Sequence, residues 1–191
     1  MKSMRERYFA HFEKIQTPAD NRRGFRTEYR YKSDYYGWDE NADALKRRRI
    51  LYFAAELLSI VIYLIAATRK TELNSIQIAA GFSVSSIVPW LAEIWGVVRF
   101  GIVKSPMIIP DFNEIKEFII VGSVVRCVLL AVGMFCGLFL IIRAGQMSVL
   151  NLLVFIGHLA SAAISLLLFR WQSSLRHRIF RNLNGRPGPE I

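Results

Sequence analysis

Four long apolar runs dominate the chain, with polar and basic segments between and around them. The runs cover residues 50–68, 76–98, 117–142 and 147–169. Each is close to the roughly 20 apolar residues that a helix needs to cross a bilayer. The pattern therefore predicts an all-α integral membrane protein, built as a four-transmembrane-helix bundle.

The segment before the first run, residues 1–49, is predicted to be a cytoplasmic arm. Apolar positions at helical spacing in residues 2–16 predict a short amphipathic helix. This helix could lie on an anionic leaflet, on a partner protein or on the protein's own cytoplasmic face. Apolar and charged residues alternate over residues 25–32, as in a short strand or extended segment. Asp39 is expected to cap a second helix that leads into the basic block at residues 46–49.

Later positions predict where helices bend, begin and end. Pro89 lies inside the second run and is expected to kink that helix, because proline has no backbone N–H to donate. Asp111, followed three residues later by Glu114, is typical of an N-cap and predicts a third helix that begins near Phe112. Residues 170–191 follow the last run and are predicted to be a basic cytoplasmic tail.

Basic residues are distributed unevenly along the 191 residues. The formal net charge is +10, and residues 1–49 hold 13 lysines and arginines, against 3 in the two connections at residues 69–75 and 143–146. Cytoplasmic segments of membrane proteins carry such an excess, so both termini are expected in the cytoplasm. Nothing signals an organelle, which favours the cell membrane of a bacterium. The expected partners are the bilayer, its anionic headgroups at the cytoplasmic face, and another membrane protein or a second copy of this chain.

Basic and aromatic residues are interleaved in the arm. Segments of this kind dock on membrane surfaces or partners, and they also bind single-stranded nucleic acid. Because four apolar spans follow, we expect docking and no nucleic acid. The candidate docking residues are Arg22, Arg23, Arg26, Tyr29, Tyr31, Tyr35, Tyr36 and Trp38.

Each apolar run carries one conspicuous ionisable residue, namely Glu56, Glu93, Arg126 or His158. Small and polar residues share a helical face with each of them, and such residues mark helix–helix contacts in membranes. All four side chains are therefore expected to point into the bundle or into a subunit interface. The companions of Glu56 include Tyr52 and Tyr63, and those of Arg126 are the candidate packing glycines Gly122, Gly133 and Gly137.

The positions of these residues along the runs also predict their depth. At 1.5 Å per residue, Glu56, Glu93 and Arg126 are roughly 9–14 Å from the inner boundary, and His158 is about 18 Å from it. The first three can meet in one layer, as a carboxylate–guanidinium–carboxylate cluster. This cluster could hold the helices in register, or it could be a proton- or solute-linked site in which one acid titrates near neutrality.

Motifs of catalysis and of metal binding are missing from the sequence. It has no phosphate-binding glycine loop, no metal-ligand spacing and no GxSxG nucleophile. Cys127 and Cys136 lie on opposite sides of one helix and cannot pair within it. We therefore expect no enzyme, no cofactor and no metal. The predicted function is that of an accessory, scaffolding or regulatory subunit of a membrane complex. The alternatives are a small oligomeric transporter or channel and, third, a membrane-embedded enzyme that acts on lipid.

Overall fold

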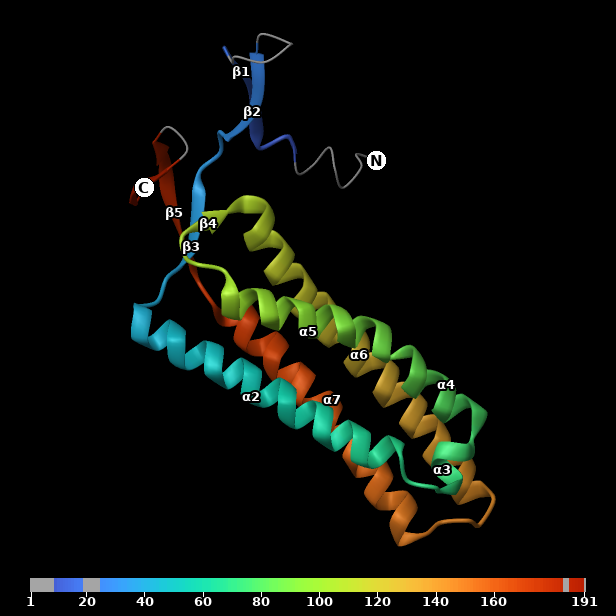
Figure 1. Ribbon diagram of the computed structural model, residues 1–191. Helices are drawn as coiled ribbons and strands as arrows, with labels where there is room; N and C mark the ends of the chain where they lie inside the picture. Colours follow the sequence, from blue (N-terminus) through green and yellow to red (C-terminus); the bar gives the residue numbers. More distant parts are fainter. Residues whose placement is uncertain (1–8, 19–24, 184–185, 191) are drawn as a thin grey trace. The chain divides into compact units, whose positions relative to one another are not determined.

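The computed structural model describes residues 9–18, 25–183 and 186–190 (Figure 1). Four of its helices are long and apolar enough to cross a membrane. The described residues also form two small sheets, so the prediction of an all-α protein is wrong in this respect. The chain divides into two compact units, which we call the sheet unit (1–40, 103–114 and 176–191) and the helical unit (41–102 and 115–175).

The first long helix, α2 (Ala42–Ala67), begins eight residues before the first apolar run. Its N-cap is Asn41, whose side chain accepts a hydrogen bond from the backbone N–H of Ala44 at 2.7 Å. The expectation that Asp39 caps this helix is therefore wrong. Asp39 pairs instead with Arg178 inside the sheet unit. An Asn side chain is as good a cap as an Asp, and only Asn41 stands directly before the helix.

The second apolar run forms one membrane-length helical segment, Gln77–Ile102, which is interrupted at Ser86, three residues before the proline expected to bend it. A short helix, α3 (Glu72–Ser75), leads into α4 (Gln77–Ser85), and α5 (Ile87–Ile102) follows after an interruption at Ser86. The place of this interruption has a simple cause. Pro89 has no N–H to donate to the carbonyl of Ser85, four residues earlier, and its ring crowds that carbonyl.

The third long helix, α6 (Ile109–Arg143), has 35 residues and begins three residues before the expected Phe112. Asp111 therefore lies inside the first turn, and the prediction that it is the N-cap is wrong. Pro110 also fits this turn, because the first backbone N–H groups of a helix have no intrahelical acceptor. The last long helix, α7 (Val149–Ser174), is capped by Ser148, whose hydroxyl accepts from the backbone N–H of Asn151 at 3.1 Å.

The two sheets are both antiparallel. One consists of β1 (Phe12–Pro18) and β2 (Phe25–Tyr31). The other has the order β4-β3-β5-β6, from β4 (Met107–Ile108), β3 (Tyr35–Trp38), β5 (His177–Leu183) and β6 (Arg186–Glu190). The second sheet thus joins three parts of the chain that are far apart in sequence. Part of the segment predicted as a cytoplasmic tail forms two of its strands.

The amphipathic helix predicted for residues 2–16 is wrong over residues 12–16, whereas Phe9 is helical and residues 10–11 form a turn. Residues 2–8 lie outside the described residues, and residues 12–16 belong to β1. The predicted extended segment at residues 25–32 corresponds to β2, which pairs with β1 over seven residues. The Phe12 and Tyr31 rings pack at 5.4 Å between centroids. Cross-strand pairing of this kind outweighs a local helical pattern.

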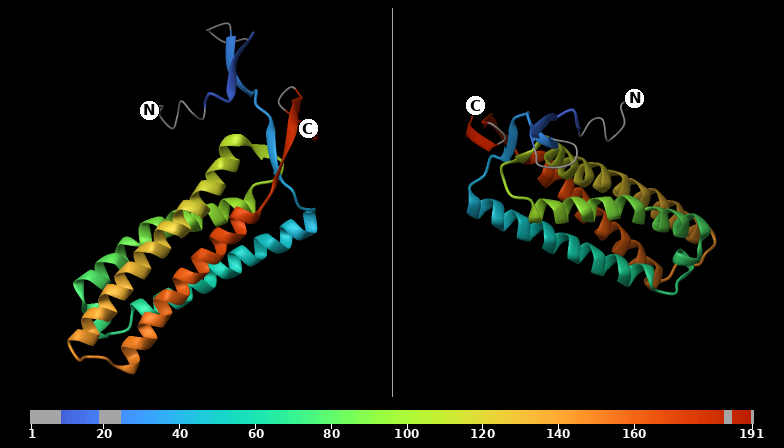
Figure 2. Two further views of the ribbon diagram at one scale, coloured as in Figure 1. Left: turned by 180° about the vertical axis from the view of Figure 1, so that it is seen from behind. Right: turned by 45° about the horizontal axis from the view of Figure 1, so that its top comes forward.

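In the helical unit, the long helices run side by side, as two further views show (Figure 2). Apolar clusters fill much of the space between them. One cluster contains Leu73, Met134 and Phe155, and another contains Tyr63, Trp90 and Leu130. The second cluster borders a buried polar layer, which holds the candidate site.

Candidate functional site

Arg126 on α6 is the centre of the buried polar layer, and its side chain is 0% exposed. Its Nη1 donates to the hydroxyls of Ser59 at 2.9 Å and Ser165 at 2.6 Å. Its Nη2 donates to the Ser161 hydroxyl at 2.5 Å. A guanidinium offers five donors in a fixed plane, so it can bind several oxygens at once. Arg126 thereby links α6 to both α2 and α7.

Glu93 on α5 is the ionic partner of Arg126. Its Oε2 lies 3.6 Å from Arg126 Nη1, and both side chains are fully buried. The same oxygen accepts from the Ser165 hydroxyl at 3.0 Å, while Oε1 accepts from the Ser123 hydroxyl at 3.1 Å. A buried ion pair is stable only where further hydrogen bonds satisfy its remaining donors and acceptors. The serines supply such bonds to Arg126 Nη1 and Nη2 and to both Glu93 oxygens, while Arg126 Nε has no hydrogen-bond partner among the described residues.

Trp90 lies between the guanidinium and the second carboxyl group. Arg126 Cζ is 3.9 Å from the Trp90 ring centroid, which is a cation–π contact. The indole Nε1 donates to Glu56 Oε1 at 2.6 Å. Among the described residues, Glu56 makes no ion pair with Arg126, and its Oε2 has no hydrogen-bond partner. The structure therefore brings the three predicted residues into one layer, but only Glu93 pairs with the arginine.

Tyr63 and His158 lie beside this layer. The Tyr63 hydroxyl donates to the backbone carbonyl of Ser83 at 2.9 Å, and its ring packs edge-on against Trp90 and His158, at 4.9 and 5.3 Å between centroids. His158 is fully buried, and neither of its ring nitrogens has a hydrogen-bond partner among the described residues. It therefore contributes an aromatic contact to the site.

Tyr52, the other predicted member, is not among the partners of Arg126. Its ring packs against Phe100 and Trp171, at 4.9 and 5.6 Å between centroids. Tyr52 thus belongs to a separate aromatic contact within the helical unit, one full turn before Glu56 on α2.

The three glycines of the Arg126 face lie where helices approach closely. A Cβ on Gly122 would be 2.8 Å from the Pro89 carbonyl oxygen and 2.9 Å from the Glu93 backbone nitrogen. One on Gly137 would be 2.8 Å from the Ala79 Cβ, and one on Gly133 would collide with Phe82. Without side chains at these positions, α6 can pack directly against α4 and α5.

The residues predicted to dock on a membrane or partner divide into three groups. Arg22 and Arg23 lie outside the described residues. Arg26 and Tyr29 are exposed on β2. Tyr31, Tyr35 and Trp38 are buried inside the sheet unit, and the half-buried Tyr36 ring packs on Phe112 and His177. The sheet unit uses these four rings for its own packing.

Tyr31 shows how the sheet unit is closed. Its hydroxyl donates to the Asp34 carbonyl at 2.8 Å and accepts from the Ile109 backbone N–H at 3.0 Å. Burial raises the pKa of the Tyr31 phenol above its ordinary value, and the bond from Ile109 acts against this rise. The phenol therefore stays protonated and keeps both bonds at neutral pH.

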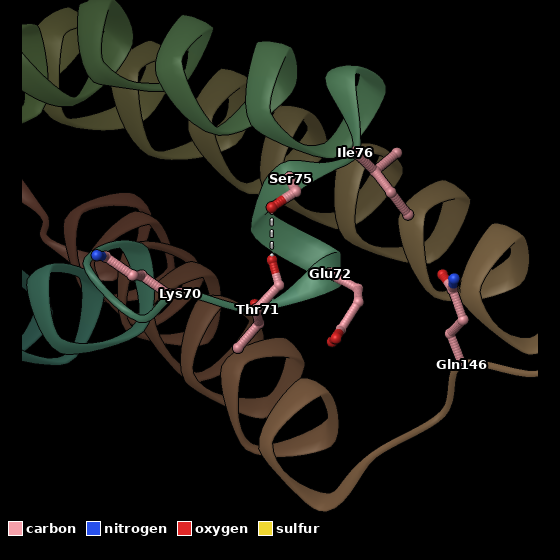
Figure 3. A pocket seen from close by; sticks show the side chains of 6 residues that line it. All are labelled: Lys70, Thr71, Glu72, Ser75, Ile76 and Gln146. Atoms are coloured by element: carbon pink, nitrogen blue, oxygen red, sulfur yellow. Dashed lines mark hydrogen bonds between the residues drawn. The ribbon is translucent and has the colours of Figure 1, made fainter.

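A pocket of about 450 Å³ lies in the helical unit, at the connection that precedes α3 (Figure 3). Six residues line it: Lys70, Thr71, Glu72, Ser75, Ile76 and Gln146. The Ser75 hydroxyl donates to the Thr71 carbonyl at 2.9 Å, the contact marked in Figure 3. The pocket wall thus contains both a lysine and a glutamate.

Asn151 on α7 holds this connection in place. Its Oδ1 accepts from the Leu73 backbone N–H at 3.2 Å, and its Nδ2 donates to Glu72 Oε2 at 2.9 Å. A hydrogen bond from its own backbone N–H and the bond from Asn151 lower the pKa of the Glu72 carboxyl. Glu72 is therefore ionised at neutral pH and fixed beside the pocket.

Comparison with known proteins identifies no relative: no family model, no curated protein and no solved structure matches the chain. Among the described residues, no group of three or more His, Cys, Asp or Glu side chains could hold a metal ion. Cys127 and Cys136 are both free thiols. The buried layer is thus one ion pair with bridging hydroxyls and a second carboxyl group beside it.

Proposed function

We propose that this chain is a non-catalytic, multi-pass membrane protein that serves as a scaffolding or accessory subunit of a membrane complex. The observation that supports this function is the buried hydrogen-bond and ion-pair network around Arg126. One side chain from α6 binds hydroxyls on α2 and α7 and a carboxylate on α5. All four long segments are thereby joined at one level.

This buried network favours a bundle with fixed helix positions over one that opens a pathway for solutes. Arg126 and Glu93 are both 0% exposed. Removing one partner of a buried ion pair typically costs about 3–5 kcal/mol, because the other charge is left without compensation. A solute that passed through this layer would have to separate the same contacts in every cycle.

The hairpin of β1 and β2 is the candidate docking element for a partner. Arg26, Tyr29 and Arg30 are exposed on β2, and the side chain of Tyr29 is 56% exposed. A hairpin of only two strands is marginally stable in water, so a partner that covers it would also stabilise it. The excess of basic residues in the arm supports placing this hairpin in the cytoplasm.

Co-purification of full-length protein in mild detergent tests the proposal. We expect partner proteins to co-purify with the wild type in stoichiometric amounts. They should be lost from the double variant that combines Tyr29→Ala and Arg30→Glu. The matched control combines Arg69→Glu and Lys70→Glu, two exposed changes in the connection between α2 and α3, and should keep the partners. Docking through the hairpin would be contradicted if both double variants co-purified the same amount of partner.

A proton-linked transporter is the second candidate function. It is favoured by the Glu56 Oε2 atom and the two His158 ring nitrogens, which are buried and have no hydrogen-bond partner among the described residues. Purified protein in vesicles that contain a pH-sensitive dye separates the two functions. A transporter should carry protons faster than empty vesicles do and lose this flux in Glu56→Gln. A scaffold should show no flux in either form.

A further inference from the structure

The buried layer contains two carboxyl groups and one guanidinium, which raises the question of how the charges balance. Glu56 and Glu93 are both buried, at 4% and 0% exposure. An ionised carboxylate without a partner costs several kcal/mol in an apolar interior. Arg126 can compensate one negative charge, and it lies within ion-pair distance of Glu93.

The hydrogen bonds of the two glutamates differ accordingly. Glu93 accepts from two serine hydroxyls and also faces the guanidinium, so both of its oxygens are satisfied. Glu56 accepts one hydrogen bond, from the Trp90 indole, and its Oε2 accepts none from the described residues. An ionised carboxylate offers about four acceptor positions, whereas an un-ionised carboxylic acid needs fewer and supplies a proton itself. With no partner at Oε2 among the described residues in either state, the un-ionised acid leaves a neutral polar group unsatisfied, whereas the carboxylate leaves a buried charge, which costs more. The environment of Glu56 therefore favours the un-ionised acid.

The ionisable groups on the neighbouring helices support the same assignment. Across from α2 they are Glu93 on α5, Arg126 on α6 and His158 on α7, and α2 itself adds Tyr63. Glu93 is negative and therefore opposes a second negative charge nearby. Arg126 already pairs with Glu93, and the Trp90 ring covers its guanidinium at 3.9 Å. His158 contacts Tyr63 with its ring edge, and no hydrogen bond joins its nitrogens to a described residue.

We propose that Glu56 holds a proton in the resting protein and is an intramembrane proton-binding site, while Glu93 is the ionised partner of Arg126. The layer then carries one positive and one negative charge. This assignment is independent of the scaffolding role, because a protonated Glu56 is compatible with a fixed bundle as well as with a transporter. Under this assignment, one un-ionised carboxyl group, that of Glu56, lies in the apolar part of α2.

Infrared spectroscopy of the full-length protein, with ¹³C in the glutamate carboxyl groups, tests this assignment directly. Un-ionised carboxyl groups absorb apart from carboxylates, and exposed glutamates are ionised at neutral pH. We expect the wild type to show an un-ionised, labelled glutamate band. The variants Glu56→Asp and Glu93→Asp form a matched pair, because each keeps a carboxyl group but removes one labelled glutamate. The band should disappear in E56D and persist in E93D.

Three results would overturn the proposal: a wild-type spectrum without the band, its persistence in E56D, or its loss in E93D. If E56D does not assemble, the other two measurements still decide. A band in the wild type that persists in E93D leaves Glu56 as the buried glutamate that carries the proton, since the glutamates at positions 13, 28, 40, 72, 114 and 117 are partly or fully exposed. A band that is present in the wild type and in E56D but absent from E93D would instead place the proton on Glu93.

Discussion

The helical unit and the sheet unit both join parts of the chain that are far apart in sequence, but they do so by different means. In the helical unit, the buried guanidinium of Arg126 binds side chains from α2, α5 and α7. In the sheet unit, backbone pairing joins β3 to β4 and β5, and the half-buried Asn182 bonds to the carbonyls of Tyr31 and Ser33, both at 2.9 Å.

This difference determines what each unit loses when a contact is removed. A polar group that is fully excluded from water keeps its whole desolvation cost when its partner disappears. A half-buried group can bind water instead, so its loss is smaller. The two units should therefore respond to comparable substitutions with effects of different size, and the following measurements test this expectation.

The largest effect should come from Arg126→Leu. This change leaves the Glu93 carboxylate buried without a cation, and we expect a loss of about 3–5 kcal/mol of stability. Unfolding in mixed micelles with increasing denaturing detergent measures it. The double variant Arg126→Leu with Glu93→Leu removes both charges, and it should recover much of the loss because apolar residues can replace a buried ion pair. A double variant as unstable as the single one would contradict the role of the ion pair.

The layer around Arg126 was largely predictable from the sequence. A charged residue inside an apolar run is conspicuous, and helical spacing places Glu93 and Arg126 on inward faces. Trp90 and Ser123 were missed as partners, although each stands three residues before one of these charges, on the same helical face. The sequence could not predict that Glu93 pairs with Arg126 and Glu56 does not, because this depends on how far each side chain reaches across the bundle.

The next effect in size concerns the close approach of α6 to α5. Gly122→Ala would place a methyl group 2.8 Å from the Pro89 carbonyl oxygen, and backbone atoms cannot turn aside as a side chain can. We expect a loss of about 1–3 kcal/mol in the same unfolding measurement. Gly81→Ala is the matched control, because a Cβ at Gly81 would meet no atom within 4 Å. Equal losses in both variants would indicate a general glycine effect instead of close packing.

In the sheet unit, Asn182→Leu should have a smaller effect. It removes the two hydrogen bonds to the carbonyls of Tyr31 and Ser33, at about 0.5–1.5 kcal/mol each, and water can reach part of this site. We expect faster exchange, relative to its intrinsic rate, of the backbone amide at position 182, which donates to Asp34 Oδ1 at 3.0 Å, and unchanged exchange around Arg126. The exposed neighbour Arg181→Ala is the control. A loss of protection in the Arg126 layer would contradict a local role for Asn182.

The sheet unit was much less predictable than the helical unit. Alternation over residues 25–32 identified β2, but the four residues of β3 and the two of β4 are too short to show a period. Their pairing depends on contacts between segments more than 60 residues apart in sequence, such as Tyr36 with Met107 and Ile179. The tyrosines of the arm were predicted to dock on a surface because aromatic residues serve packing and docking equally well. Composition alone does not distinguish these two uses.

The smallest effect should be a pH dependence at the connection before α3. The pKa of Glu72 is lower in the folded protein, so its stabilising contribution is present above the ordinary glutamate pKa of about 4.3 and is lost as the pH falls through the folded value. The Leu73 amide, which donates to Asn151 Oδ1, should then exchange faster at acid pH than its intrinsic rate predicts. Glu72→Gln should remove this pH dependence, while Glu117→Gln, an exposed change on α6, should keep it. Glu72 is exposed and Arg126 is not, so acid should speed amide exchange near Glu72 but not near Arg126. Equal acceleration at both sites would contradict the distinction between contacts that water can replace and contacts that it cannot.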